Sequence, residues 1–141
     1  MNLKLKFKLL NKDSILPIVD HADDAGFGIY SSEEKVLKPM DFVGISTGIS
    51  SEIPNGYFVS FRDRSSMAIK GLHVMGGVID AGYRGEWKVI IINLGKENYK
   101  ILKGDKIAQG ILQKLEKYKI TTVDKLTKTK RGSGGFGSTG R

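Results

Sequence analysis

Short apolar runs separated by turn signals constrain the fold of this chain more than any other feature. Leu and Phe alternate with Lys through residues 3–9, and this period of two places the apolar side chains on one face of a strand. Further strands are predicted at residues 42–45, 57–61, 77–79, 87–93 and 107–115. Turns rich in Gly, Pro or Asp separate them at residues 54–56, 80–85 and 103–105. Many short strands without a long helical period are typical of an all-β sandwich or jelly roll.

One short helix is predicted at residues 65–70. Ser65 and Ser66 can cap its start, and Gly71 can supply the left-handed residue after its end. The last eleven residues, 131–141, hold five glycines and one aromatic ring. Such a segment cannot pack a core, so we expect it to be mobile unless a ligand orders it. We therefore predict a β domain at residues 1–128 and a flexible Gly-rich tail at residues 129–141.

The composition excludes several classes of protein. The sequence contains no cysteine, so disulfides, thiolate metal sites and cysteine nucleophiles are ruled out. No apolar run is long enough to cross a bilayer, and the Lys-rich start lacks the unbroken apolar segment of a signal peptide. We therefore expect no membrane partner. The expected location is cytoplasmic, or the cytoplasm or nucleus of a host cell if the chain is viral.

The charge of the chain is concentrated near its C-terminus. The formal net charge is +8, and residues 114–141 carry +6 of it, from eight basic and two acidic side chains. Such a distribution favours an anionic partner: nucleic acid, a membrane surface or a phosphorylated small molecule. A merely solvated tail is the alternative explanation.

Several familiar binding motifs are absent or lack the structural context that they need. Gly132, Gly134 and Gly137 have the spacing of a dinucleotide-binding fingerprint, but that fingerprint needs a preceding strand and a following helix. The sequence also lacks a phosphate-binding P-loop. His21 and His73 lack metal-ligand spacing, so we expect them to be loop or surface residues.

Two stretches have the residue types of a functional site. Arg64, Ser65 and Ser66 lie where a strand gives way to the predicted helix. Exposed amides, two hydroxyls and a guanidinium together can cradle a phosphate. Asp80 follows an apolar pair at a hairpin mouth, where a carboxylate can orient a water. Structural roles compete with both interpretations, because serines also cap helices and aspartates also close turns.

Five segments, taken in order, resemble the five motifs of the trimeric deoxyuridine triphosphatase (dUTPase) family. They lie at residues 25–30, 63–68, 77–85, 104–109 and 131–140, and the third and fifth are the most specific. The resemblance runs from residue 3 to the end of the chain. It implies a distorted jelly-roll or β-clip sandwich that assembles as a homotrimer. Each active site would take its third motif from a neighbour and its fifth motif from the remaining chain.

The resemblance also implies a reaction. The family hydrolyses dUTP to dUMP and pyrophosphate, which limits uracil in DNA and supplies dUMP for dTMP synthesis. Asp80 would orient and deprotonate the water that attacks the α-phosphorus in line. Mg²⁺ would arrive bound to the substrate triphosphate, with no direct protein ligand.

Three groups of residues would bind the substrate according to the same resemblance. The phosphate chain would be held by Arg64, Ser65, Ser66 and Gln109. Uracil would be read by the hairpin at Gly77, Val78, Ile79 and Lys88. The lid at residues 129–141 would close over the ligand with Arg131, Phe136, Gly137, Ser138 and Thr139. Within these groups Phe136 would stack on the base, while Tyr83 would lie against the deoxyribose and leave no room for a 2′-hydroxyl.

Two positions depart from the family pattern. Gly28 stands where the family has an aspartate that helps to hold the metal through water. Asp23 or Asp24 would have to replace that carboxylate through water, and we expect a weaker magnesium dependence. Asp63 replaces the usual proline, and its carboxylate would either pair with Arg64 or add charge beside the metal site.

Two other functions stay open from the sequence. A dCTP deaminase would share the fold and the trimer, but Tyr83 and Phe136 favour the triphosphatase. A nucleic-acid-binding or regulatory protein on the same fold would use the basic tail. The retained Asp80 argues against this second alternative.

Overall fold

The computed structural model describes residues 3–140; residues 1 and 2, and Arg141 of the basic tail, lie outside the described part. Within this part the chain forms eleven strands and one helix. They are β1 (Lys6–Leu9), β2 (Phe27–Tyr30), β3 (Lys35–Leu37), β4 (Phe42–Ser46), β5 (Ile49–Glu52), β6 (Tyr57–Arg62), α1 (Ser65–Ala68), β7 (Leu72–Met75), β8 (Val78–Ile79), β9 (Lys88–Asn93), β10 (Tyr99–Ile101) and β11 (Lys106–Lys114). No helix in residues 3–140 has the length and apolar character needed to cross a membrane.

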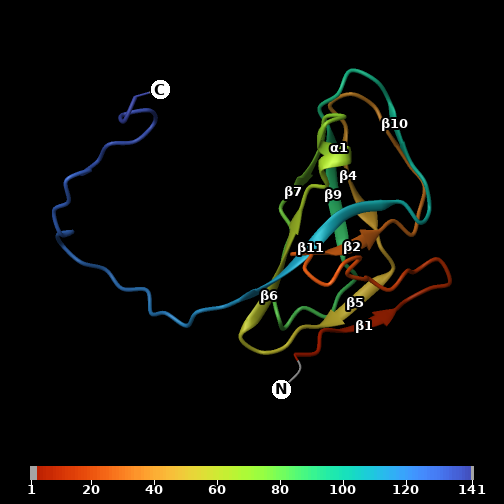
Figure 1. Cartoon of the computed structure of the whole chain (residues 1–141), viewed down its shortest axis with the longest axis horizontal. Helices are drawn as coiled ribbons and strands as arrows, with labels where there is room; N and C mark the ends of the chain where they lie inside the picture. Colours follow the sequence, from red (N-terminus) through yellow and green to blue (C-terminus); the bar gives the residue numbers. More distant parts are fainter. Residues whose placement is uncertain (1–2, 141) are drawn as a thin grey trace.

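The strands pair antiparallel in four small sheets. The largest has the order β2-β11-β6-β8, and a second has the order β4-β9-β7. β1 pairs with β5, and β3 pairs with β10. Figure 1 shows these strands wrapped into one body, with the single turn of α1 at one end. The predicted all-β class with one short helix is confirmed.

The core forms around Trp87, which is fully buried just before β9. The rings of Phe7, Phe27 and Phe61 surround the indole, with centroids 5.2, 6.4 and 5.5 Å away. A buried indole N–H also needs an acceptor, and the hydroxyl of Ser51 accepts it at 3.1 Å. β9 then alternates exposed and buried residues, as expected of a strand with one face on the core.

β11 positions the predicted phosphate-binding residues because it pairs with two strands at once. Gln109 lies opposite Gly28 of β2 on one side and opposite Arg62 of β6 on the other. The register with β2 shifts between Lys106 and Ala108, so β11 carries a bulge there. Side chains three residues apart on a regular strand face opposite sides, but the extra residue lets Lys106 and Gln109 share one side.

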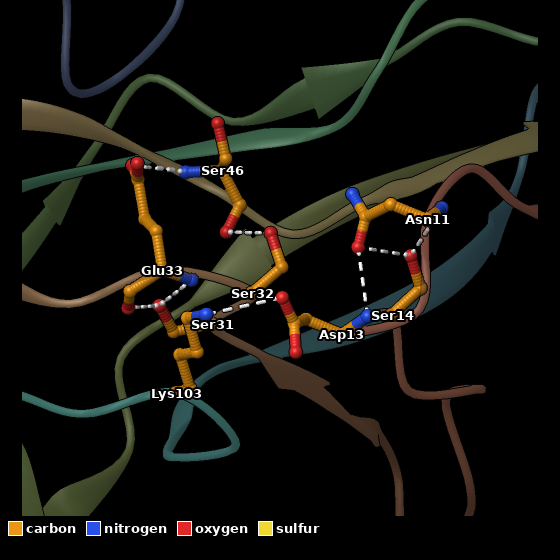
Figure 2. Close-up of polar contacts among 8 residues, drawn as sticks. All are labelled: Asn11, Asp13, Ser14, Ser31, Ser32, Glu33, Ser46 and Lys103. Atoms are coloured by element: carbon orange, nitrogen blue, oxygen red, sulfur yellow. Dashed lines mark hydrogen bonds and ion pairs between the residues drawn. The ribbon is translucent and has the colours of Figure 1, made fainter.

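A polar network attaches the loops that flank these strands (Figure 2). The hydroxyl of Ser31, just after β2, donates to the carbonyl of Glu33 at 2.6 Å. The Glu33 carboxylate accepts the main-chain N–H of Ser46 at 2.9 Å. Ser31 also donates its N–H to the Asp105 carbonyl and accepts the N–H of Gly104, both at 2.8 Å. The turn before β11 is therefore attached to the end of β2.

The helix differs from its prediction. α1 ends at Ala68 rather than at residue 70, and its N-cap is the extended Arg64. No side-chain bond caps the helix among the described residues, so the predicted capping role of Ser65 and Ser66 is wrong. Both serines lie inside the first turn, which leaves their hydroxyls available to a ligand. Gly71 has a φ of 85°, which confirms the predicted left-handed end.

Most predicted strands are present, but five others are not apparent in the sequence. β4, β6, β8, β9 and β11 agree with their predictions to within a residue or so, whereas β1 begins at Lys6 rather than at residue 3. β2, β3, β5, β7 and β10 were not predicted. β2 has buried residues on both faces and thus no alternation. β3 and β10 are three residues each and depend on pairing with each other.

The chain leaves the body after β11 and runs along a wide arc (Figure 1). Residues 115–140 form no strand or helix. Four apolar side chains in the first half of this segment are 62–86% exposed: Tyr118, Ile120, Val123 and Leu126. Apolar side chains exposed in this number favour a second surface that covers them.

The bond from Trp87 to Ser51 supplies a test of the core. Ser51→Ala leaves the buried indole N–H without its acceptor, so we expect the free energy of unfolding to fall by about 1–3 kcal/mol. Denaturant unfolding at fixed protein concentration measures this loss. Ser50→Ala is the matched control, since no bond from the Ser50 hydroxyl is found in the described chain. Equal losses in the two variants would contradict the role given to Ser51.

Candidate active site

A cleft of about 370 Å³ lies where β2, β11 and the start of α1 meet. Its cationic and donor side chains are Arg64, Ser65, Ser66, Lys106 and Gln109. Main chain at Gly26 and Gly28 forms another wall, and the carboxylates of Asp20 and Asp24 stand at its rim. All four residues predicted to hold phosphates are thus brought together, from two segments distant in sequence. We call this the phosphate cleft.

Arg64 is held between the end of β6 and β11. Its Nη1 donates to the carbonyl of Lys106 at 2.8 Å. The side-chain amide of Gln109 donates to the carbonyl of Asp63 at 2.8 Å, which attaches the same turn to β11 a second time. One guanidinium N–H is used by the protein, so most of its donors remain for an anion. The two bonds set the position of the arginine before any ligand binds.

Asp63 does not pair with Arg64, contrary to one of the two predicted alternatives. Its Oδ1 accepts the N–H of Val74 at 2.6 Å, and its Oδ2 lies 2.6 Å from Nδ1 of His73. Successive residues of an extended segment face opposite sides, so Asp63 faces β7 while Arg64 faces β11. The carboxylate therefore anchors the turn that carries the arginine. His73 lies exposed on β7 and His21 in an exposed loop, as predicted.

A second cleft, of about 410 Å³, lies along the hairpin that follows β8. Its lining is Val78, Ile79, Asp80, Tyr83, Glu86 and Lys88. The hydroxyl of Tyr83 donates to the carbonyl of Glu86 at 3.0 Å, which holds the ring over the hairpin. A Cβ at Gly85 would lie 2.4 Å from that hydroxyl, so only glycine permits this contact. We call this the hairpin cleft.

Asp80 stands exposed at the mouth of the hairpin cleft. Its carbonyl accepts the N–H of Tyr83 at 3.1 Å, which closes the turn through the main chain. The turn therefore does not need the Asp80 carboxylate, which is left free for chemistry. Gly77 precedes β8 with a φ of 93°, and a Cβ there would lie 2.7 Å from Cβ of Phe61.

The two clefts have no lining residue in common. The predicted lid residues lie apart from both of them, on the arc of Figure 1. Among the described residues the lid makes only local bonds, such as that from Nε of Arg131 to the carbonyl of Gly134 at 3.0 Å. Phe136 is fully exposed, and Gly137, Ser138 and Thr139 are also exposed. Within one copy of the chain, the three predicted groups of substrate-binding residues thus lie apart.

Comparison with known proteins decides which family has this arrangement. The sequence model of the dUTPase family matches residues 12–140. A deoxyuridine 5′-triphosphate nucleotidohydrolase of Clostridium tetani is 45% identical over 140 residues, covering 97% of this chain and 97% of the relative. A protein of the same name from Clostridium kluyveri is 45% identical over 141 residues, covering 98% and 99%. The chain belongs to the dUTPase family.

Solved dUTPase structures share this fold over nearly its whole length. A mutant dUTPase of Staphylococcus bacteriophage 80alpha with dUpNHpp has a TM-score of 0.91 at 29% identity, covering 98% of this chain and 99% of that chain. A mutant dUTPase from phage phi11 of S. aureus, described with a structural Mg(II) ion, has a TM-score of 0.82 at 27% identity, covering 89% and 99%. Family membership favours dUTP hydrolysis over the dCTP deaminase and nucleic-acid-binding alternatives.

In this dUTPase the phosphate cleft contains an ion pair that the sequence did not reveal. Nζ of Lys106 contacts the carboxylate of Asp20 and lies 5.7 Å from the ring centroid of Tyr30. The hydrogen bond from Lys106 holds the pKa of Asp20 below its ordinary value. The pair joins residues 86 positions apart, so no local pattern could have indicated it.

The carboxylates at the cleft suit a hydrated Mg²⁺ better than a protein-enclosed one. Across residues 3–140, no three His, Asp or Glu side chains gather into a group that could enclose a metal ion. Of the two residues predicted to act through water, Asp24 lines the phosphate cleft, and His21 donates its N–H to it at 3.1 Å. Asp23 does not line the cleft. Mg²⁺ keeps several waters and needs only one or two carboxylates beside substrate phosphates, so this donor set fits it.

The anchoring role of Asp63 can be tested against that of its histidine partner. Asp63→Ala removes the acceptor of a main-chain N–H, and we expect a loss of about 1–3 kcal/mol in the free energy of unfolding. His73→Ala removes only an exposed pair and should cost less than about 1 kcal/mol. Denaturant unfolding of both variants measures the difference. A larger loss for His73→Ala would contradict the assignment.

Proposed function

We propose that this dUTPase cleaves dUTP between the α-phosphorus and the pyrophosphate, with Asp80 as the group that activates water. The observation that carries the proposal is that the two clefts offer different chemical groups. The hairpin cleft offers an exposed carboxylate beside an aromatic ring, and the phosphate cleft offers a guanidinium, two hydroxyls and an amide. Hydrolysis of a nucleoside triphosphate requires a general base and an aromatic contact for the sugar. It also requires a separate set of donors for the phosphates.

The reaction needs one proton transfer and one displacement. Asp80 accepts a proton from water as the water oxygen bonds to the α-phosphorus. The bond from that phosphorus to the bridging oxygen breaks, and pyrophosphate leaves with the electron pair. Arg64, Ser65, Ser66 and Gln109 position the phosphate chain and stabilise charge that develops on its oxygens. None of them forms a covalent bond with the substrate.

Selection of the nucleoside rests on the hairpin. Tyr83 is fixed by its bond to the Glu86 carbonyl, so its ring cannot withdraw to admit a ribose 2′-hydroxyl. Val78, Ile79 and Lys88 line the same cleft, and their main-chain groups would read the edge of uracil. Gly77 lies outside this lining, and its carbonyl accepts the N–H of Phe61 at 2.7 Å, so its part would be to set the path of β8. The thymine methyl is excluded by the closeness of this main chain to the base.

Magnesium enters with the substrate. Asp24, with the phosphates of dUTP, would hold the hydrated ion, and the ion would neutralise charge on the departing pyrophosphate. Asp24 is oriented for this by His21, whose N–H and Nδ1 lie 3.1 and 3.0 Å from its Oδ2.

A complete site needs more than one copy of the chain. The hairpin cleft and the phosphate cleft have no lining residue in common, and the lid reaches neither of them within its own chain. A homotrimer resolves this, with the hairpin of one subunit and the lid of another meeting the phosphate cleft of a third. The exposed Tyr118, Ile120, Val123 and Leu126 would then be covered as the segment crosses a neighbour.

The lid would close the site after substrate binds. Phe136 stacks on the base, while Arg131, Ser138 and Thr139 donate to the phosphates. Gly137 has a φ of 91°, and its freedom lets the segment fold around the ligand. Closure excludes bulk water, which strengthens the electrostatic contacts in the site.

Replacement of the proposed base tests the chemistry. Asp80→Asn keeps the shape but cannot accept the proton, so kcat for dUTP should fall by about 10²–10⁴. Pyrophosphate release measures kcat, and calorimetry with dUpNHpp should show that binding is retained. Glu86→Gln is the matched control: it changes the other carboxylate of the cleft but keeps the oxygen that accepts the N–H of Gly48. A kcat for Asp80→Asn within about tenfold of the wild type would contradict the role of Asp80.

Mixed trimers test whether sites are shared. Asp80→Asn and a chain that ends before Arg131 should each be nearly inactive as pure trimers. When equal amounts are refolded together, a site with an intact hairpin from one subunit and an intact lid from another arises in about a quarter of cases. Turnover should therefore recover to about a quarter of the wild-type rate. No recovery, despite mixed trimers seen by mass spectrometry, would show that hairpin and lid come from the same chain.

A further inference from the structure

One end of the phosphate cleft is built differently from the rest. The bulge in β11 turns Lys106 to the same side as Gln109, so both side chains line the cleft. The side chain of Lys106 is only 22% exposed, and its ammonium lies between the Asp20 carboxylate and the ring of Tyr30. A lysine held in this way keeps its charge inside the cleft instead of extending it into solvent.

Gly28 makes this path possible. A Cβ built on Gly28 would lie 2.8 Å from Cε and 3.0 Å from Cδ of Lys106. The lysine stem thus occupies the space that a side chain at position 28 would need. Any larger residue there, including an aspartate, would require Lys106 to move. The glycine and the lysine therefore have to be considered together.

We propose that Lys106 is a further substrate-binding residue, whose ammonium binds the β- and γ-phosphates of dUTP. Before substrate binds, Asp20 holds this ammonium in place. The inference rests on the proposed function, because it assumes that the cleft receives a nucleoside triphosphate. Asp20 acts through Lys106 and is a positioning residue. A triphosphate carries several negative charges and outcompetes one exposed carboxylate for the ammonium.

A consequence concerns magnesium. With glycine at position 28, the cleft has one negative charge less than it would have with a carboxylate there. Lys106 then neutralises phosphate charge that otherwise needs a divalent ion. Triphosphate binding should therefore persist when magnesium is removed. This physical account agrees with the weaker magnesium dependence expected from the sequence.

The first experiment measures binding rather than turnover. Calorimetry with dUpNHpp in EDTA compares the wild type with Lys106→Met, which keeps the aliphatic stem, and Lys106→Arg, which restores the charge. We expect Lys106→Met to weaken dUpNHpp binding about tenfold or more, with partial rescue by Lys106→Arg. Binding of dUMP, which lacks the outer phosphates, should change less than about threefold. Equal effects on dUpNHpp and dUMP, or no effect on either, would overturn the inference.

A second set of variants tests the roles of Asp20 and Gly28. Asp20→Asn removes both the carboxylate that positions the ammonium and its competitor, so its effect on dUpNHpp binding in EDTA should be smaller than that of Lys106→Met. A loss as large as that of Lys106→Met would show that Asp20 does more than position Lys106. Gly28→Asp should increase the ratio of dUpNHpp affinities with and without magnesium. Gly28→Ala adds the same Cβ without charge, so it shows the effect of displacing Lys106 alone, and its ratio should lie between those of the wild type and Gly28→Asp. Equal ratios for Gly28→Asp and the wild type would contradict the charge argument.

Two controls distinguish a binding effect of Lys106 from a folding defect and from a failure of the proposed function. Each variant is first shown to have the wild-type oligomeric mass and unfolding midpoint. If the wild type neither binds dUpNHpp nor hydrolyses dUTP, the proposed function fails. If the wild type does both and Lys106→Met binds dUpNHpp as tightly as the wild type, only the inference about Lys106 fails.

Discussion

The pairing of β11 with β2 on one side and β6 on the other is the constraint on which the phosphate cleft depends. It places Gln109 opposite Gly28 and next to the turn that carries Arg64. The bulge in β11 adds Lys106 to the same face. Because these contacts come from sheet hydrogen bonds and main-chain acceptors, the cleft is formed before substrate arrives. Such preorganisation is what lets charged groups stabilise a transition state without rearranging.

The other residues proposed for the site lie on the hairpin and the C-terminal segment. Two bonds within the hairpin hold its side chains: Tyr83 is bonded to the Glu86 carbonyl, and Arg84 donates to the Ala81 carbonyl at 2.6 Å. Beyond Leu115 the C-terminal segment, in contrast, makes only local hydrogen bonds in the described chain, and it carries exposed apolar side chains. The hairpin and the extended lid lie on separate parts of one chain, as expected if sites are assembled between subunits. In such a site, closing the lid and completing the site would be one event.

Local patterns predicted much of this fold, and long-range contacts account for what they missed. The strands around residues 57–61 and 87–93 were predicted because alternation and turn residues are local signals. The predicted phosphate residues also lie in one cleft, because Arg64 follows the end of β6 and Gln109 of β11 lies opposite Arg62 of that strand. The contact of Asp63 with Val74 and the pair of Lys106 with Asp20 depend on how distant strands align, and the bulge at β11 decides the second of these. A side chain's direction after a bulge cannot be read from spacing alone.

The central claim is that water, activated at the hairpin, attacks the α-phosphorus of dUTP in a cleft that holds the other two phosphates. Hydrolysis in oxygen-18 water tests this most directly, with both products analysed by mass spectrometry after a single turnover. The account predicts that the label enters dUMP and that pyrophosphate stays unlabelled. Label in pyrophosphate, or release of orthophosphate in place of pyrophosphate, would show that the attack occurs at a different phosphorus and would contradict the account.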